Sequence, residues 1–96
     1  MNRQREVDML LAGNTVQFRP VGNSMTPRIQ SRQLVTFSPD ISAVEVGDIV
    51  LCKVNGVIMC HLVTAIQGDR YQISNNHGHV NGWTKHIYGK VVKIED

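Results

Sequence analysis

The chain of 96 residues is long enough for one domain and too short for two. Its 42% hydrophobic and 19% charged residues are typical of a globular protein, and a net charge of +2 is too weak to indicate a nucleic-acid surface. The longest apolar runs, Ile49–Cys52 and Val57–Cys60, are far shorter than the roughly 20 residues that span a membrane, and no export signal begins the chain. We therefore expect one soluble cytoplasmic domain over residues 1–96, with no membrane anchor and no nucleic-acid partner.

The first predicted element is a helix from Arg3 to Ala12. Three apolar residues share one face of this segment at helical spacing: Val7, Leu10 and Leu11. Asn2 is the predicted N-cap, and Gly13 is the predicted residue just past the C-terminal end.

Everything after this helix is predicted to be β-structure, because short apolar segments alternate with turns rich in Gly, Pro, Asn and Asp. The expected strands are Thr15–Val21, Leu34–Phe37, Ile49–Val54, Val57–Ile66, Tyr71–Ser74, Lys85–Tyr88 and Lys90–Ile94. We predict a polar loop over Asn75–Trp83, with Trp83 covering one end of the β-structure. Many short strands at this spacing indicate a mainly-β fold: a coiled or partly open β-barrel over residues 15–94, with one helix at its edge.

Asn55-Gly56 is the strongest hairpin signal in the chain, since an apolar run lies on each side of it. If these two residues form the turn, Leu51 faces Cys60 and Cys52 faces Met59. The two cysteines then lie on opposite faces of the sheet, where they cannot form a disulfide. We expect two buried thiols in a reducing compartment.

The segment Val21–Pro27, which reads Val-Gly-Asn-Ser-Met-Thr-Pro, lies between two predicted strands. Such a junction can expose a nucleophile and leave backbone N–H groups free, although the same residue types also build ordinary β-turns. Ser24 needs a base within hydrogen-bond reach to act as a nucleophile. His61 is the candidate because it stands among apolar strand residues that would hold its ring, but a lone histidine there is commonly structural.

The other three histidines lie in or beside the polar segment and are expected to be exposed: His77, His79 and His86. The spacing His77-Gly78-His79 is compatible with zinc, but no acidic residue lies between Arg70 and Glu95. A structural zinc usually requires four ligands, so we predict no metal site and no cofactor.

Three motifs occur along the chain in this order: Val21–Pro27, Val46-Gly47-Asp48-Ile49-Val50 and Tyr88–Val92. Together they resemble the motifs of the signal peptidase and LexA-type repressor superfamily of serine peptidases. Val21–Pro27 is similar to the Gly-x-Ser-Met-x-Pro segment that carries the nucleophile. Val46-Gly47-Asp48-Ile49-Val50 is similar to the Gly-Asp-Ile-Val strand before the base, and Tyr88–Val92 is similar to the closing strand. His61 stands where relatives of the endoplasmic-reticulum type have a histidine and bacterial signal peptidases have a lysine.

The resemblance implies a serine endopeptidase that uses a Ser24–His61 dyad to cut an extended protein or peptide segment at an exposed strand edge. Residues beside the nucleophile would bind the oxyanion and position the substrate: Gly22, Asn23 and Met25. The family's Gly-Asp-Asn segment corresponds to Ser74-Asn75-Asn76, which implies that Asn75 orients the histidine.

The sequence departs from the family pattern at Asn75, where a carboxylate would stabilise the imidazolium better, and at Leu62, where the relatives have Arg. The alternative function is therefore a weakly active or inactive protein-binding module on the same fold. Such a module would be a homodimer that pairs exposed strands, with Asn75–Trp83 as its recognition surface.

A full LexA-type repressor is disfavoured because it requires a helix-turn-helix domain. Self-cleavage at Ala12-Gly13 is disfavoured because Ala-Gly is an ordinary helix ending.

Overall fold

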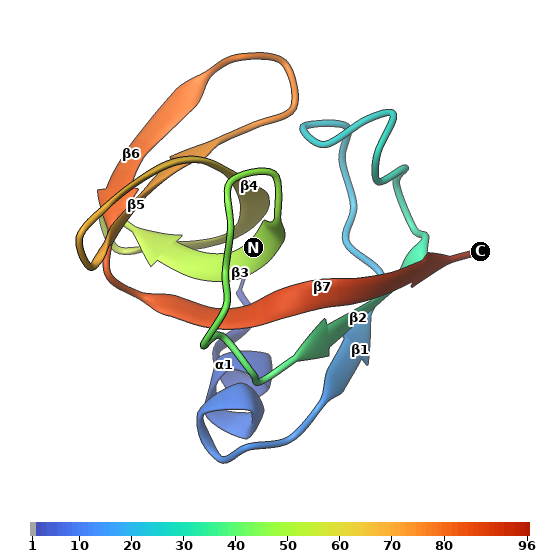
Figure 1. The fold of residues 1–96 in the computed structure, drawn as a ribbon. Coiled ribbons are helices and arrows are strands. Elements are labelled where there is room, and N and C mark those ends of the chain that lie inside the picture. Colours follow the sequence, from blue (N-terminus) through green and yellow to red (C-terminus); the bar gives the residue numbers. More distant parts are fainter. Residues whose placement is uncertain (1) are drawn as a thin grey trace.

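The computed structural model describes residues 2–96, over which it has one α-helix and seven β-strands. In chain order they are α1 (Gln4–Leu11), β1 (Val16–Phe18), β2 (Leu34–Ser38), β3 (Ile49–Val54), β4 (Val57–Gln67), β5 (Arg70–Ser74), β6 (Val80–Thr84) and β7 (Ile87–Glu95). The strands form one antiparallel sheet in the order β1-β2-β7-β3-β4-β5-β6 (Figure 1). Within residues 2–96, no helix has the length and apolar character needed to cross a bilayer.

The predicted fold class is confirmed: a mainly-β chain with one N-terminal helix and a coiled sheet (Figure 1). The sheet stays open rather than closing into a barrel, because its pairing order leaves β1 and β6 as edge strands. Alternating residues of β3 enter two separate hydrophobic clusters. Leu51 belongs to the cluster that also contains residues of α1, and Cys52 belongs to the other.

The predicted hairpin register is confirmed between β3 and β4, where Leu51 pairs with Cys60 and Cys52 with Met59. Both turn residues have positive φ, 50° at Asn55 and 81° at Gly56, as the preferred two-residue hairpin turn requires. The two cysteines are free and buried, and they lie in different hydrophobic clusters, as expected for opposite sheet faces.

The N-cap of α1 is Arg3, so the prediction for Asn2 is wrong. No side chain caps this end; instead, the Arg3 guanidinium lies 4.2 Å from the centre of the Phe18 ring. The C-terminal end is as predicted, because Gly13 has a φ of +90° and its N–H donates to the Leu10 carbonyl.

Three predicted segments differ from the structure. The strand expected over Thr15–Val21 is shorter and covers only Val16–Phe18. The predicted polar loop Asn75–Trp83 includes most of the edge strand β6. Trp83 in this strand stays 41% exposed rather than covering an end of the sheet. The two strands expected on either side of Gly89 are one strand, β7. Gly89 is needed there for close packing, because a Cβ atom would lie 2.9 Å from both terminal methyl groups of Leu10 in α1.

Candidate active site

Ser24 lies in the turn-rich segment between β1 and β2, with its side chain exposed. Two apolar residues anchor this segment to the core: Met25 and Ile29 are each only 4% exposed, and the Ile29 N–H donates to the Met25 carbonyl at 3.0 Å. The Thr26 hydroxyl and N–H both donate to the Asn23 carbonyl, at 2.8 and 3.2 Å. The segment is therefore held in place on both sides of Ser24 while the hydroxyl faces outward.

The structure brings Ser24 and His61 together, although 37 positions separate them along the chain. His61 lies on β4, half-buried, and its Nε2 is 3.1 Å from Ser24 Oγ. Its Nδ1 is 2.7 Å from Oδ1 of Asn81 on β6. Since an amide oxygen only accepts, Nδ1 carries the hydrogen in the neutral ring, and the Nε2 lone pair faces the Ser24 hydroxyl.

Burial lowers the pKa of His61 below its ordinary value of 6.5. The hydrogen bond to Asn81 opposes this effect, and the nearby His79 lowers the pKa further. The net result favours a neutral imidazole near neutral pH, which is the form that can accept a proton from a serine hydroxyl.

The prediction that Asn75 orients the histidine is wrong, because Asn81 makes this contact. Asn75 Oδ1 instead accepts hydrogen bonds from the N–H groups of His77 and His79, at 2.8 and 3.0 Å. Sequence reasoning missed Asn81 because it lay in the predicted polar loop, where nothing indicated a strand that would direct it toward β4.

The three residues predicted to bind the oxyanion and position the substrate lie beside Ser24, but their backbone groups differ in availability. The Gly22 N–H donates to Ser31 Oγ at 3.1 Å and is already occupied. The Asn23 carbonyl accepts hydrogen bonds from Thr26 and His77. Within residues 2–96, the N–H groups of Ser24 and Met25 donate no hydrogen bond to a protein acceptor. Within the same range the Asn23 N–H also donates no hydrogen bond, but of these three residues only Ser24 and Met25 line the pocket that His61 lines.

Sequence reasoning also missed the contacts that Asn76 and His77 make with this segment. The Asn76 N–H donates to the Ser24 carbonyl at 2.8 Å, and its side-chain amide donates to the Thr26 carbonyl at 2.9 Å. His77 Nε2 lies 2.9 Å from the Asn23 carbonyl oxygen. The loop between β5 and β6 therefore packs against the segment that carries Ser24, at the top of Figure 1.

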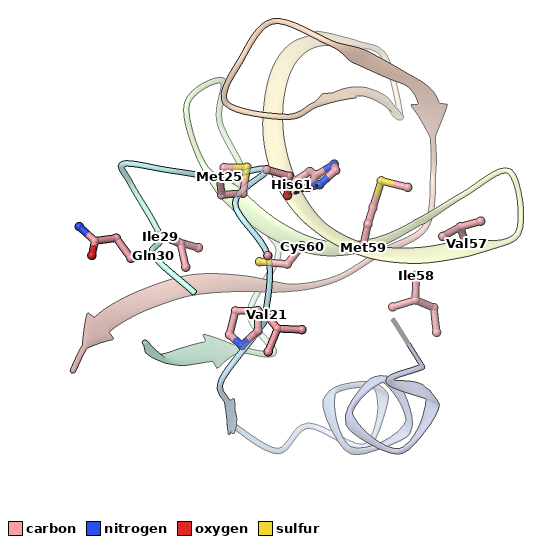
Figure 2. Close-up of a pocket in the computed structure, with 12 residues that line it drawn as sticks. Val21, Met25, Ile29, Gln30, Val57, Ile58, Met59, Cys60 and His61 are labelled. Carbon is pink, nitrogen blue, oxygen red and sulfur yellow. Dashed lines mark hydrogen bonds between the residues drawn. The ribbon is translucent and has the colours of Figure 1, made fainter. Parts of the chain in front are cut away.

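A pocket of about 250 Å³ lies beside the dyad, and both Ser24 and His61 line it. Its other walls come from the segment after β1 and from the first half of β4, and they are mostly apolar (Figure 2). Figure 2 labels Val21, Met25 and Ile29 on the wall after β1, and Val57, Ile58 and Met59 on the wall formed by β4. The arrangement places the Ser24 hydroxyl at the side of a pocket suited to an apolar side chain.

One backbone edge of β4 is free next to this pocket. β3 pairs with β4 from Val57 to Leu62, whereas β5 pairs with β4 only from Leu62 onward. Among the described residues, the stretch 57–61 thus has a strand partner on one side only. Such an edge can accept an extended peptide as an additional strand.

The remaining histidines do not gather into a metal site. Within residues 2–96, no three His, Cys, Asp or Glu side chains are positioned to hold one metal ion. His77 is instead in contact with the segment that carries Ser24.

The family model described as Peptidase S24-like matches residues 5–92, a range that includes the dyad, Asn81 and the loop that contacts Ser24. The match confirms the resemblance to the signal peptidase and LexA-type superfamily. A search of curated proteins found no match to the chain.

Proposed function

Because the chain belongs to the Peptidase S24-like family, we propose that it is a serine endopeptidase that cleaves extended polypeptide segments with a Ser24–His61 dyad. The observation that carries this proposal is the 3.1 Å separation between Ser24 Oγ and His61 Nε2, with Nδ1 held by Asn81. Ser24 is exposed beside an open pocket, which favours the enzyme over a binding module in which the hydroxyl would lie buried.

In the proposed mechanism, His61 Nε2 takes the hydroxyl proton of Ser24 as Oγ attacks the substrate carbonyl. The carbonyl oxygen becomes an oxyanion, which accepts hydrogen bonds from free backbone N–H groups beside Ser24. His61 then gives the proton to the leaving amine, and the C–N bond breaks to leave an acyl-enzyme. Water attacks the ester while His61 accepts one of its protons, and return of that proton to Oγ releases the acid and restores Ser24.

The substrate in this proposal binds as an extended strand along the free edge of β4, residues 57–61. Main-chain hydrogen bonds to β4 would hold it in register, and a side chain near the cleaved bond would enter the apolar pocket. Two exposed apolar residues, Val21 and Val57, add contact surface at the rim. Specificity for apolar side chains follows from the chemistry of these walls.

The neutral Asn81 sets a limit on the rate. An amide holds the required tautomer of His61, but it stabilises the developing imidazolium less than a carboxylate would. We therefore propose a peptidase of modest turnover.

Labelling with a fluorophosphonate tests the proposal, since this probe phosphonylates activated serine hydroxyls. The wild-type protein is expected to form one adduct at Ser24, while Ser24→Ala and His61→Ala form none at the same exposure time. Ser42→Ala and His86→Ala are matched controls that remove the same side-chain types away from the dyad, and both should label as the wild type does. Equal labelling of Ser24→Ala, or no labelling of the folded wild-type protein at pH 8, would overturn the proposal.

A further inference from the structure

The backbone carbonyls of Asn23 and Ser24 both receive hydrogen bonds from the loop between β5 and β6. His77 Nε2 lies 2.9 Å from the Asn23 oxygen and 3.3 Å from Thr26 Oγ1. Since a carbonyl only accepts, His77 Nε2 carries a hydrogen and donates it. The Asn76 N–H donates to the Ser24 oxygen at 2.8 Å. One loop therefore holds two successive carbonyls of the segment that carries the nucleophile.

The direction of a carbonyl determines the direction of the next N–H. The peptide bonds that join Asn23 to Ser24 and Ser24 to Met25 are trans. In a planar trans peptide the C=O and the following N–H point in opposite directions. Because both carbonyls point toward the loop, the N–H groups of Ser24 and Met25 point away from it.

These two N–H groups have the features of an oxyanion-binding pair. Neither has a protein acceptor within residues 2–96, and both Ser24 and Met25 line the pocket beside His61. Successive N–H groups that face one side form a concave site for negative charge. The Gly22 N–H does not join them, since it donates to Ser31. The Asn23 N–H is unpaired as well, but Asn23 does not line the pocket, and within residues 2–96 the loop donates no hydrogen bond to the Gly22 carbonyl that precedes it.

We infer that Asn76 and His77 are positioning residues for the oxyanion: by holding the carbonyls of Asn23 and Ser24, they aim the N–H groups of Ser24 and Met25 at the oxygen of the tetrahedral intermediate. The inference rests on the proposed peptidase function and assigns to the β5–β6 loop a role in that reaction. Neither residue touches the reacting atoms.

The loop itself is held in shape by Asn75. Its Oδ1 accepts the N–H groups of His77 and His79, and its own N–H donates to the His79 carbonyl at 2.9 Å. An asparagine side chain that bonds the backbone two residues ahead fixes a turn locally. Asn75 thus keeps His77 in reach of Asn23.

Removing an oxyanion donor in a serine protease lowers kcat by about 10²–10³-fold. Loss of His77 should cost less, because the Thr26 hydroxyl and N–H still hold the Asn23 carbonyl. We expect kcat of His77→Leu to fall about tenfold, with KM unchanged. Asn75→Ala should behave similarly, whereas Asn75→Asp, which retains the acceptor oxygen, should stay near the wild-type rate.

The test compares hydrolysis of 4-nitrophenyl acetate with hydrolysis of its thiono analogue, in which sulfur replaces the carbonyl oxygen. Sulfur is a weak hydrogen-bond acceptor, so the thiono ester gains little from aimed N–H groups. In His77→Leu the oxo-ester rate should fall about tenfold while the thiono rate and the pH midpoint stay the same. His86→Leu, a matched loss of an exposed imidazole, should change neither rate.

A second measurement needs no variant. Binding of phenylboronic acid to the wild-type protein should move the amide NMR signals of Ser24 and Met25 and leave that of Gly22 in place.

Equal loss of both ester rates in His77→Leu, or unchanged rates in both His77→Leu and Asn75→Ala, would overturn the inference. So would unmoved Ser24 and Met25 signals in a protein whose Ser24 binds the boronate. Equal hydrolysis by the wild type and Ser24→Ala is a different failure: it would overturn the proposed function, and the inference with it.

Discussion

Replacing Asn81 by Asp is the most informative single change at this site. The carboxylate would take the position of an amide oxygen that lies 2.7 Å from His61 Nδ1, with almost no change in shape. It would keep the Nδ1–H tautomer and add a negative charge beside the ring. We therefore expect Asn81→Asp to raise both the pKa of His61 and the rate of the reaction.

The size of the effect follows from the separation of the charges. Opposite charges about 4 Å apart attract by about 1 kcal/mol in water and by about 4 kcal/mol at an effective dielectric constant of about 20. His61 is half-buried, so its environment lies between these limits. Since about 1.4 kcal/mol corresponds to one pKa unit, the pKa of His61 should rise by about 1 to 3. If half of this stabilisation acts in the transition state, the rate at high pH rises by about 2- to 30-fold.

The assay is the pH profile of fluorophosphonate labelling, together with an NMR titration of the His61 ring that does not depend on activity. Asn14→Asp adds the same charge in the exposed segment between α1 and β1 and should leave both titrations unchanged. Asn81→Leu removes the acceptor and should slow labelling at every pH. An Asn81→Asp protein whose His61 titration coincides with that of the wild type would refute the contact between residues 81 and 61.

Four further predictions follow from burial and packing. Because burial holds the pKa of His61 below 6.5, labelling should rise with pH through a midpoint below this value. The free energy of unfolding should likewise fall as pH drops below about 6.5, since the unfolded chain then binds the proton more readily; a pH-independent unfolding free energy in urea would contradict this. Gly89→Ala should lower the free energy of unfolding in urea by about 1–3 kcal/mol, because the new methyl group would clash with Leu10. The loss should be much smaller in a protein that already carries Leu10→Ala, and an equal loss with and without Leu10→Ala would exclude this clash. Burial raises the pKa of the Cys52 and Cys60 thiols to about 12. A thiol reagent at pH 8 should therefore react slowly with both cysteines until urea unfolds the chain. Fast reaction of the native protein would contradict the burial of these thiols.

Local sequence patterns predicted the features that depend on neighbouring residues. Asn55-Gly56 determined the hairpin register, because positive φ at both positions selects one turn and one pairing of the flanking strands. Gly13 marked the end of α1 for the same conformational reason. The resemblance of Val21–Pro27 to a nucleophile segment then pointed to Ser24, and with it to His61 as the partner.

Edge strands were harder to predict from sequence. β6 reads Val-Asn-Gly-Trp-Thr, without the alternation of apolar and polar residues that marks a half-buried strand, and it pairs with β5 alone. Its pairing therefore depends on a neighbour already in place. Gly89 led to the opposite error, because a glycine inside an apolar segment is typical of a break between two strands. In the structure it lies within the continuous strand β7 and leaves room for α1 to pack against it.

The chain by itself thus determined its mainly-β class, its hairpin and the two residues proposed to carry out the reaction. Only the tertiary structure decided what supports them: Asn81 rather than Asn75 beside His61, and the β5–β6 loop against the Ser24 segment. These contacts join residues 20 to 54 positions apart. The way the sheet coils brings them within hydrogen-bond distance, and no local pattern encodes that coiling.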